Sequence, residues 1–249
     1  MPRLDTDAAW RSLETAPPGD RFSDGMVEEL PAIGRRYLAH AIAPDTPLAS
    51  SVTLTMSGAI KPGGPWMRFK ARQVLTPGLG FIWSVSARWG PLMISGEDYL
   101  VQGGGGTYMR LFGVAPFLSA GGPDVTRSAL GRLAAESVLL PSSLLPLNGA
   151  TWHEDSGGRA RVDVPAGDGA ETLSLSIGEE GQLREVVIDR WGNQTESGDF
   201  ALIPFGVKVH DESTFGGYTI PTRLEAGWWF GSERYAPFFR AEIEEAAFR

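Results

Sequence analysis

Charged side chains that fall among apolar residues are the positions of this sequence at which chemistry could occur. Glu136 lies in a stretch with helical spacing, while Glu97, Asp98, Arg110 and Arg190 lie in stretches of alternating polarity. A charge that faces inward must be paired or have a shifted pKa. These groups therefore predict either ion pairs that brace the fold or contacts to the polar end of a ligand, and the ion pair is the commoner outcome for any one of them.

An enzyme would divide these residues between acid–base groups and a cation. Glu136, Asp98 or Glu97 would act as general acid or base, and Arg110 or Arg190 would stabilise developing negative charge. A cyclase, isomerase or hydrolase acting on an apolar substrate fits this set. Such an enzyme needs a carboxylate with a raised pKa facing the ligand, whereas a binding protein needs only apolar walls. Both hypotheses stay open at this point.

A metal-dependent alternative depends on His153, Asp155, His210 and Arg223. Their order reproduces the H-x-D…H…R pattern of 2-oxoglutarate-dependent iron oxygenases, in which two imidazoles and a carboxylate hold Fe(II). The surroundings of His153 are those of a strand end and a turn, which would leave these groups in water. A three-residue pattern also arises easily by chance. We therefore predict no metal and no cofactor.

Other reactive motifs are missing from the sequence. Ser142 and Ser143 lack the G-x-S-x-G elbow of serine hydrolases, and the chain has no cysteine. No P-loop or dinucleotide fingerprint is present, and the run Gly103–Gly106 fits a hairpin turn rather than a phosphate cradle.

Composition limits the class of partner. The chain has 249 residues, is 42% hydrophobic and carries a formal net charge of -8. That charge argues against nucleic acid or anionic lipid headgroups as the main partner. No apolar run approaches the ~20 residues that a membrane span requires. We expect a soluble, cytoplasmic protein without a membrane span, and its oligomeric state stays unknown.

One helix stands out in a sequence that otherwise alternates. Apolar residues recur at helical spacing over residues 124–146, and Leu133 and Ala134 belong to that apolar stripe. Arg132 and Glu136 lie one turn apart, off the stripe, where they can pair. A shorter helix is expected over 31–42. Residues 1–24 are expected to form a flexible N-terminal arm and residues 25–249 a single domain.

Alternating polarity predicts about ten strands on either side of the central helix. Turn residues such as glycine, asparagine and aspartate separate these segments. The fold class is therefore α+β, mostly β, with one curved antiparallel sheet packed on the helix. The expected strands cover residues 51–57, 66–75, 81–86, 92–101, 107–112, 159–164, 172–177, 183–191, 200–210, 219–230 and 238–243.

Short motifs in a fixed order carry a family resemblance over most of residues 28–248. They are Leu30–Leu38, Phe69–Gln73, Gly80–Trp83, Asp98–Tyr99, Leu133–Glu136, Leu140–Pro146, Trp152, Gly217, Ile220–Pro221 and Glu225–Trp228. In these motifs the chain resembles a bacterial family of unknown function whose half-barrel is related to lipoprotein carriers. The resemblance implies a half-barrel around helices, with an apolar hollow suited to an acyl or isoprenoid-like molecule. It carries no established activity.

The leading hypothesis is a protein that binds an apolar small molecule between the sheet and the central helix. Residues of one parity share a strand face, so the aromatic side chains of neighbouring strands should project together. An enzyme in the same cavity and a scaffold filled by its own side chains are the alternatives. The predicted lining residues are Phe69, Gln73, Phe81, Trp83, Tyr108, Leu133, Ala134 and Trp228, with Gln73, Arg110 and Glu136 at the polar end.

Overall fold

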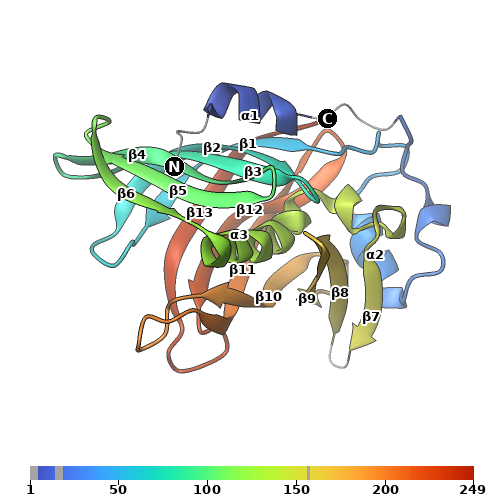
Figure 1. Ribbon diagram of the computed structural model, residues 1–249. Helices are drawn as coiled ribbons and strands as arrows, with labels where there is room; N and C mark the ends of the chain where they lie inside the picture. Colours follow the sequence, from blue (N-terminus) through green and yellow to red (C-terminus); the bar gives the residue numbers. More distant parts are fainter. Residues whose placement is uncertain (1–4, 15–18, 156–157) are drawn as a thin grey trace.

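The structure, a computed structural model, describes residues 5–14, 19–155 and 158–249. In these residues thirteen strands form one antiparallel sheet in the order β6-β5-β4-β3-β2-β1-β13-β12-β11-β10-β9-β8-β7. The two outermost strands, β6 and β7, do not pair with each other, so the sheet stays open. It curves around the central helix α3 (Figure 1). This curved half-barrel, mostly β, confirms the predicted fold class.

The strands are β1 (Val52–Ile60), β2 (Met67–Thr76), β3 (Gly80–Trp89), β4 (Leu92–Val101), β5 (Gly104–Leu111), β6 (Ala115–Gly121), β7 (Thr151–Asp155), β8 (Arg159–Ala166), β9 (Gly169–Ile177), β10 (Leu183–Gly192), β11 (Ala201–Phe215), β12 (Tyr218–Trp228) and β13 (Ala236–Phe248). The α-helices are α1 (Thr6–Leu13), α2 (Ala32–Ala41) and α3 (Pro123–Ala135). Short 3-10 helices are η1 (Asp24–Met26), η2 (Glu136–Leu139), η3 (Pro141–Leu144) and η4 (Pro146–Asn148).

The chain forms two meanders joined through the helix. Strands β1 to β6 follow each other as hairpins, α3 then crosses the hollow, and β7 to β13 return until β13 pairs with β1. Helix α3 contacts β5 from the first meander and β10 from the second. One helix therefore contacts both meanders, as Figure 1 shows.

Strand alternation explains which side chains face the hollow. In β2 the odd-numbered residues, such as Phe69 and Gln73, are buried, while Arg68 and Lys70 are exposed on the outer face. The sequence missed β6, because Ala115–Gly121 lacks alternating polarity and is mostly exposed. Pairing with β5, rather than a buried face of its own, makes that segment a strand.

The predicted helix over 124–146 is shorter than expected. It ends at Ala135, and three 3-10 turns follow it. Pro141 and Pro146 each begin one of these turns, since proline supplies no amide donor to continue a helix. The turns still bury apolar side chains, and Ser142 Oγ ties them to the carbonyl of Ala49 at 2.6 Å.

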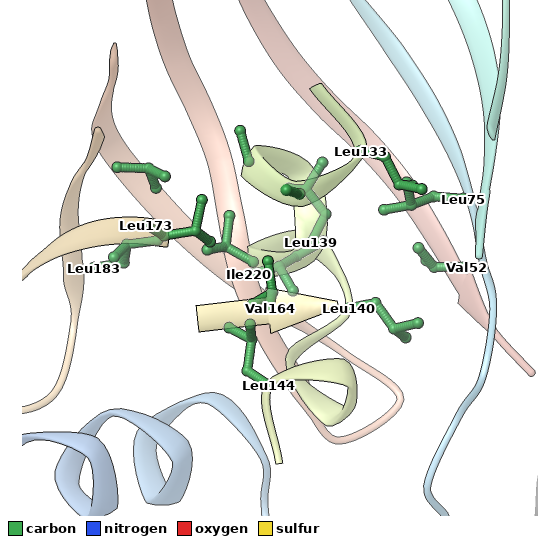
Figure 2. Close-up of a cluster of buried hydrophobic side chains, with 14 of the residues drawn as sticks. Val52, Leu75, Leu133, Leu139, Leu140, Leu144, Val164, Leu173, Leu183 and Ile220 are labelled. Carbon is green, nitrogen blue, oxygen red and sulfur yellow. The ribbon is translucent and has the colours of Figure 1, made fainter. Parts of the chain in front are cut away.

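The main core fills the end of the half-barrel around these turns (Figure 2). Leu139, Leu140 and Leu144 lie there between strands of the two meanders. Leu133 of α3 points into the same core and is 3% exposed. Two further residues of this core are Leu75 of β2 and Val164 of β8.

Part of the segment expected to be a flexible arm is a packed helix. Ala9 and Leu13 of α1 lie on Val74 and Ile82, on the outer face of β2 and β3. The apolar side chains at positions 9 and 13 are one turn apart, so one face of the helix covers the sheet. The parts of the expected arm at 1–4 and 15–18 lie outside the described residues.

Candidate ligand-binding site

A cavity of about 640 Å³ lies between α3 and the concave face of the sheet. This volume falls within the range of small-molecule sites. The apolar part of its wall comes mainly from strands β1, β10, β11, β12 and β13. These residues are Met56, Ile60, Val186, Phe205, Val207, Val209, Leu224, Ala226, Trp228, Phe238, Phe239, Ala241 and Ile243.

A polar cluster centred on Arg132 forms another part of the wall. Arg132 Nε donates to Glu136 Oε1 at 2.7 Å, and its Nη1 forms an ion pair with Asp98. Thr107 donates to the other oxygen of Asp98 at 2.7 Å, and Gln73 Nε2 donates to Glu136 Oε2 at 2.5 Å. Both carboxylates are therefore hydrogen-bonded on both of their oxygens.

Strand register and helix spacing bring this cluster together. Asp98 of β4 lies opposite Trp83 of β3 on one side and Thr107 of β5 on the other, all three on the inner face. Arg132 and Glu136 follow at i and i+4 on α3 and its 3-10 extension, where side chains meet. The cluster thus links three strands to the helix.

The charge of Arg132 is compensated within the cluster. Burial lowers the pKa of Arg132, but Glu136 and Asp98 more than offset this effect and leave the pKa above its usual range. The guanidinium also lies over the ring of Phe81, 4.5 Å from the centroid, and 5.4 Å from that of Trp83. Aromatic faces attract a cation, so they add to the two ion pairs.

Arg190 of β10 has a different environment. Its Nε donates to the carbonyl of Ser128 at 3.0 Å, and its guanidinium carbon lies 5.0 Å from the ring centroids of both Phe205 and Trp228. It forms no ion pair with a carboxylate of the described residues. Burial, and then the nearby charge of Arg132, lower its pKa to about 10. A guanidinium without a counter-ion therefore faces the cavity.

Six of the predicted site residues line the cavity together. They come from five strands and the helix end, and four of the six are polar. They are Gln73, Trp83, Asp98, Glu136, Arg190 and Trp228. The ion pair expected between Arg132 and Glu136 is also present.

Three other predicted site residues, Glu97, Tyr108 and Arg110, lie on the outer face of the sheet and not on the face that borders the cavity. Glu97 is paired in register with Tyr108, one position away from the inward pair of Asp98 and Thr107. Arg110 has the same parity as Tyr108 and lies 5.0 Å from its ring, on the outer face. Alternation reveals which residues share a face but not which face turns inward, and this is why the three were misplaced.

Four predicted lining residues are inward but belong to the core. Phe69 stacks on Phe239 at 5.2 Å, and Phe81 lies beneath Arg132. Leu133 and Ala134 are 3% and 2% exposed and pack away from the cavity. The helix presents other residues to the cavity instead: Val125, Ser128, Ala129, Arg132 and Ala135.

Arg132, at the centre of the polar cluster, is a site residue that the sequence prediction missed. The sequence predicts only an ion pair between Arg132 and Glu136, because Arg132 falls off the leucine stripe. A second stripe, Ala129, Arg132 and Ala135, runs at i, i+3 spacing along the same helix. Small residues on both sides of an arginine were the signal for a buried cation with space beside it.

The residues of the iron hypothesis are not assembled. His153 Nε2 contacts Asp163 at 3.2 Å, and Arg223 pairs with Asp211 at 2.6 Å. Strands β8, β9 and β10 separate β7, which carries His153, from β11, which carries His210. In the described part of the chain, no group of three or more histidine, aspartate or glutamate residues could hold a metal ion.

Fold and site together define a half-barrel protein with an internal, mainly apolar cavity and a charged wall. The chain matches the Family of unknown function (DUF6544) over residues 20–241 and belongs to it. This agrees with the resemblance found in the sequence. No curated protein matches the chain.

Solved structures give three similar folds at low sequence identity. A LolA superfamily protein from Nitrosomonas europaea has 8% identity and a TM-score of 0.44, and the match covers 88% of this chain and 92% of that protein's chain. A putative outer membrane lipoprotein-sorting protein domain from Vibrio parahaemolyticus has 7% identity and a TM-score of 0.42. A DUF1329 family protein from Desulfovibrio piger has 8% identity and the same TM-score. The latter two comparisons each cover 80% of this chain and 86% of the other.

No helix in the described residues has both the length and the apolar character that a membrane span requires.

Proposed function

We propose that this protein binds an apolar small molecule, such as an acyl or isoprenoid-like compound, in the cavity between α3 and the sheet. The observation that supports this most directly is the cavity itself: about 640 Å³ bordered largely by aliphatic and aromatic side chains. A hollow of this size with apolar walls favours an apolar occupant, because each buried methylene group contributes about 0.8 kcal/mol. The binding needs no cofactor.

The enzyme hypothesis requires a carboxylate that can exchange a proton with the ligand. Asp98 and Glu136 face the cavity, but Arg132 pairs with both. Thr107 and Gln73 occupy their remaining oxygens. These contacts favour a bracing role for the two carboxylates, so we propose binding without turnover. The cytoplasmic location stays a prediction, and the proposed binding does not depend on it.

Native mass spectrometry of the protein as purified tests the proposal. We expect a bound species of low mass that solvent extraction removes and that partitions into the organic phase. Titration of the extracted protein with the fluorescent apolar probe N-phenyl-1-naphthylamine gives a second readout, since its emission rises in an apolar site. An extracted protein that gives no emission increase, and that was purified without a bound species, would contradict the proposed function.

A further inference from the structure

The two arginines that face the cavity differ in their counter-ions. Arg132 has two carboxylates, whereas Arg190 pairs with none of the described ones. Of the five N–H donors of a guanidinium, Arg190 uses one on the carbonyl of Ser128 at 3.0 Å and one on its hydroxyl at 3.4 Å. The surrounding residues therefore satisfy this cation only in part.

The indole of Trp83 supplies a second unpaired donor. Trp83 lines the cavity and is 4% exposed, and its Nε1–H has no hydrogen-bond partner among the described residues. A buried donor without a partner costs about 1–3 kcal/mol. The side chains of Trp83 on β3 and Arg190 on β10 therefore both have N–H donors without an acceptor among the described residues.

We propose that the ligand is an amphiphile with an anionic head, and that the head pairs with Arg190 while the chain lies along the apolar strands. This inference rests on the proposed function and adds the chemical class of the ligand. Carboxylate and phosphate heads share the required chemistry, because both present anionic oxygens to a guanidinium.

The charges of the cavity also predict where the head lies. Arg132, Arg190, Asp98 and Glu136 sum to zero, and the two carboxylates surround Arg132. An anion is repelled on that side and attracted on the side of Arg190. The rings of Phe205 and Trp228, each 5.0 Å from the Arg190 guanidinium, exclude water beside it and so strengthen the pairing.

The test compares ligands that share a chain and differ in the head. Hexadecanoate, hexadecyl phosphate and hexadecan-1-ol are titrated into extracted protein by displacement of N-phenyl-1-naphthylamine. We expect one or both anions to bind about 10- to 100-fold more tightly than the alcohol, which is the range of a charge-assisted hydrogen bond. The preferred anion distinguishes a carboxylate ligand from a phosphate ligand.

Substitutions assign this selectivity to Arg190. In Arg190→Gln the ratio of anion to alcohol affinity should fall close to one, while the alcohol binds as before. Arg190→Lys should keep part of the ratio because it keeps the charge. Arg127→Gln is the matched control: Arg127 lies on α3, is exposed and stacks on Trp191 at 3.9 Å, away from the cavity wall. The ratio of anion to alcohol affinity should be unchanged in this control variant.

The outcomes separate the two proposals. Equal affinity of the wild-type protein for anions and alcohol, or a ratio that survives Arg190→Gln, overturns the anionic head and leaves apolar binding intact. Failure of all three ligands to displace the probe in the wild-type protein counts against the proposed function itself.

A second inference depends on a different part of the surface. Five large apolar side chains are exposed at the end of β3, on the turn after β5 and on β6: Trp89, Phe112, Val114, Phe117 and Leu118, which we call the apolar tip. Val114 is 80% exposed and Phe117 62%. In Figure 1 this end of β4, β5 and β6 projects beyond the rest of the sheet. Clustered exposed apolar groups of this kind mark an interaction site.

Basic residues accompany the apolar tip. Residues 51–121 contain six Lys or Arg and two Asp or Glu, although the whole chain has a formal net charge of -8. Arg68 and Arg88 are register partners on the outer face, and Lys70 and Arg110 lie on the same face. None of these four forms an ion pair within the described part of the chain.

We infer that the apolar tip docks on an anionic lipid surface. The basic face supplies the electrostatic attraction, about 1 kcal/mol per cation near such a surface, and the tip supplies apolar contact with the acyl boundary. Leu118 belongs both to the tip and to the cavity wall. Docking in this way places the cavity next to the membrane, where an amphiphile can enter or leave it.

Vesicle sedimentation tests this docking. We expect the protein to sediment with vesicles of phosphatidylcholine and phosphatidylglycerol and to stay in solution with phosphatidylcholine alone. The double variant Phe112→Ser, Val114→Ser should lose at least 5-fold in vesicle affinity. Leu147→Ser and Leu202→Ser, which change exposed leucines elsewhere, should bind as the wild-type protein does. No sedimentation with either vesicle, or a concentration-dependent dimer that the double variant abolishes, would overturn the inference.

Discussion

Gln73 and Glu136, 63 positions apart in the chain, are joined by a hydrogen bond of 2.5 Å from Nε2 to Oε2. It connects β2 to the end of the central helix across the inner face of the sheet. The same carboxylate accepts from Arg132 through its other oxygen at 2.7 Å. Glu136 therefore holds the helix to the sheet on one side and neutralises a buried cation on the other.

Replacement of Glu136 should reveal this double role. Glu136→Leu leaves Gln73 without its acceptor and Arg132 with one carboxylate, so we expect a loss of about 3–5 kcal/mol in the free energy of unfolding. Glu136→Gln keeps an acceptor and should cost about 1–3 kcal/mol. Urea denaturation followed by tryptophan fluorescence measures both. Equal stability of the Leu variant and the wild type would show that the network does not hold the helix.

The two arginines of the cavity should respond oppositely to the same substitution. Arg132→Met leaves Asp98 and Glu136 buried without their cation, and we expect it to destabilise the protein by about 3–5 kcal/mol. Arg190→Met removes a buried cation that has no counter-ion, and we expect it to stabilise the ligand-free protein by about 1–4 kcal/mol. Thermal unfolding of the two variants beside the wild type measures the contrast. Destabilisation by both would mean that Arg190 is structurally compensated.

The stabilising effect of Arg190→Met should depend on pH. The pKa of Arg190 is lowered from 12.5 to about 10 in the folded protein. Between these values the unfolded chain binds more protons than the folded one, so the wild type gains stability as pH rises through about 10. The advantage of the Met variant is therefore full below pH 10 and shrinks above it. Denaturation of both proteins at pH 8, 9, 10 and 11 measures this difference, and a constant difference would contradict the lowered pKa.

Strand parity made most of this fold predictable from the sequence, and it also set the limit of the prediction. The alternation over Phe69–Gln73 correctly placed the amide of Gln73 and the ring of Phe69 on the same buried face of β2. In β5, however, Tyr108 and Arg110 alternate just as well, and nothing local shows that their face turns outward. Only the position of β5 in the sheet, with α3 packed on its inner side, decides between the two faces.

In α3, too, the local spacing did not show which side of the helix borders the cavity. The leucine stripe identified its core side, and this predicted Leu133 and Ala134 as cavity residues. In the structure the core encloses that stripe, so Ala134→Phe is expected to overpack the core at a cost of about 1–3 kcal/mol rather than to block the cavity. The cavity side carries Ala129 and Ala135, whose small size leaves the space open.

Docking of α1 can be tested at Leu13, which is 3% exposed and packs on Val74 and Ile82. Leu13→Ala removes this contact, and we expect a loss of about 2–4 kcal/mol in the free energy of unfolding. Leu147→Ala is the control, because Leu147 is 55% exposed and should cost less than about 0.5 kcal/mol. If the two variants were equally stable, α1 would contribute nothing to the fold.

Filling the cavity should separate ligand binding from folding. Val207 lies on the apolar wall, in the middle of β11, and its side chain borders the open volume. Val207→Trp places an indole in that space, so we expect the affinity for N-phenyl-1-naphthylamine to fall at least 10-fold while the midpoint of thermal unfolding changes little. Leu202→Trp is the matched control, since Leu202 lies on the same strand and is 55% exposed, and it should bind the probe normally. A Val207→Trp protein that folds and still binds the probe at full affinity would place the binding site outside this cavity.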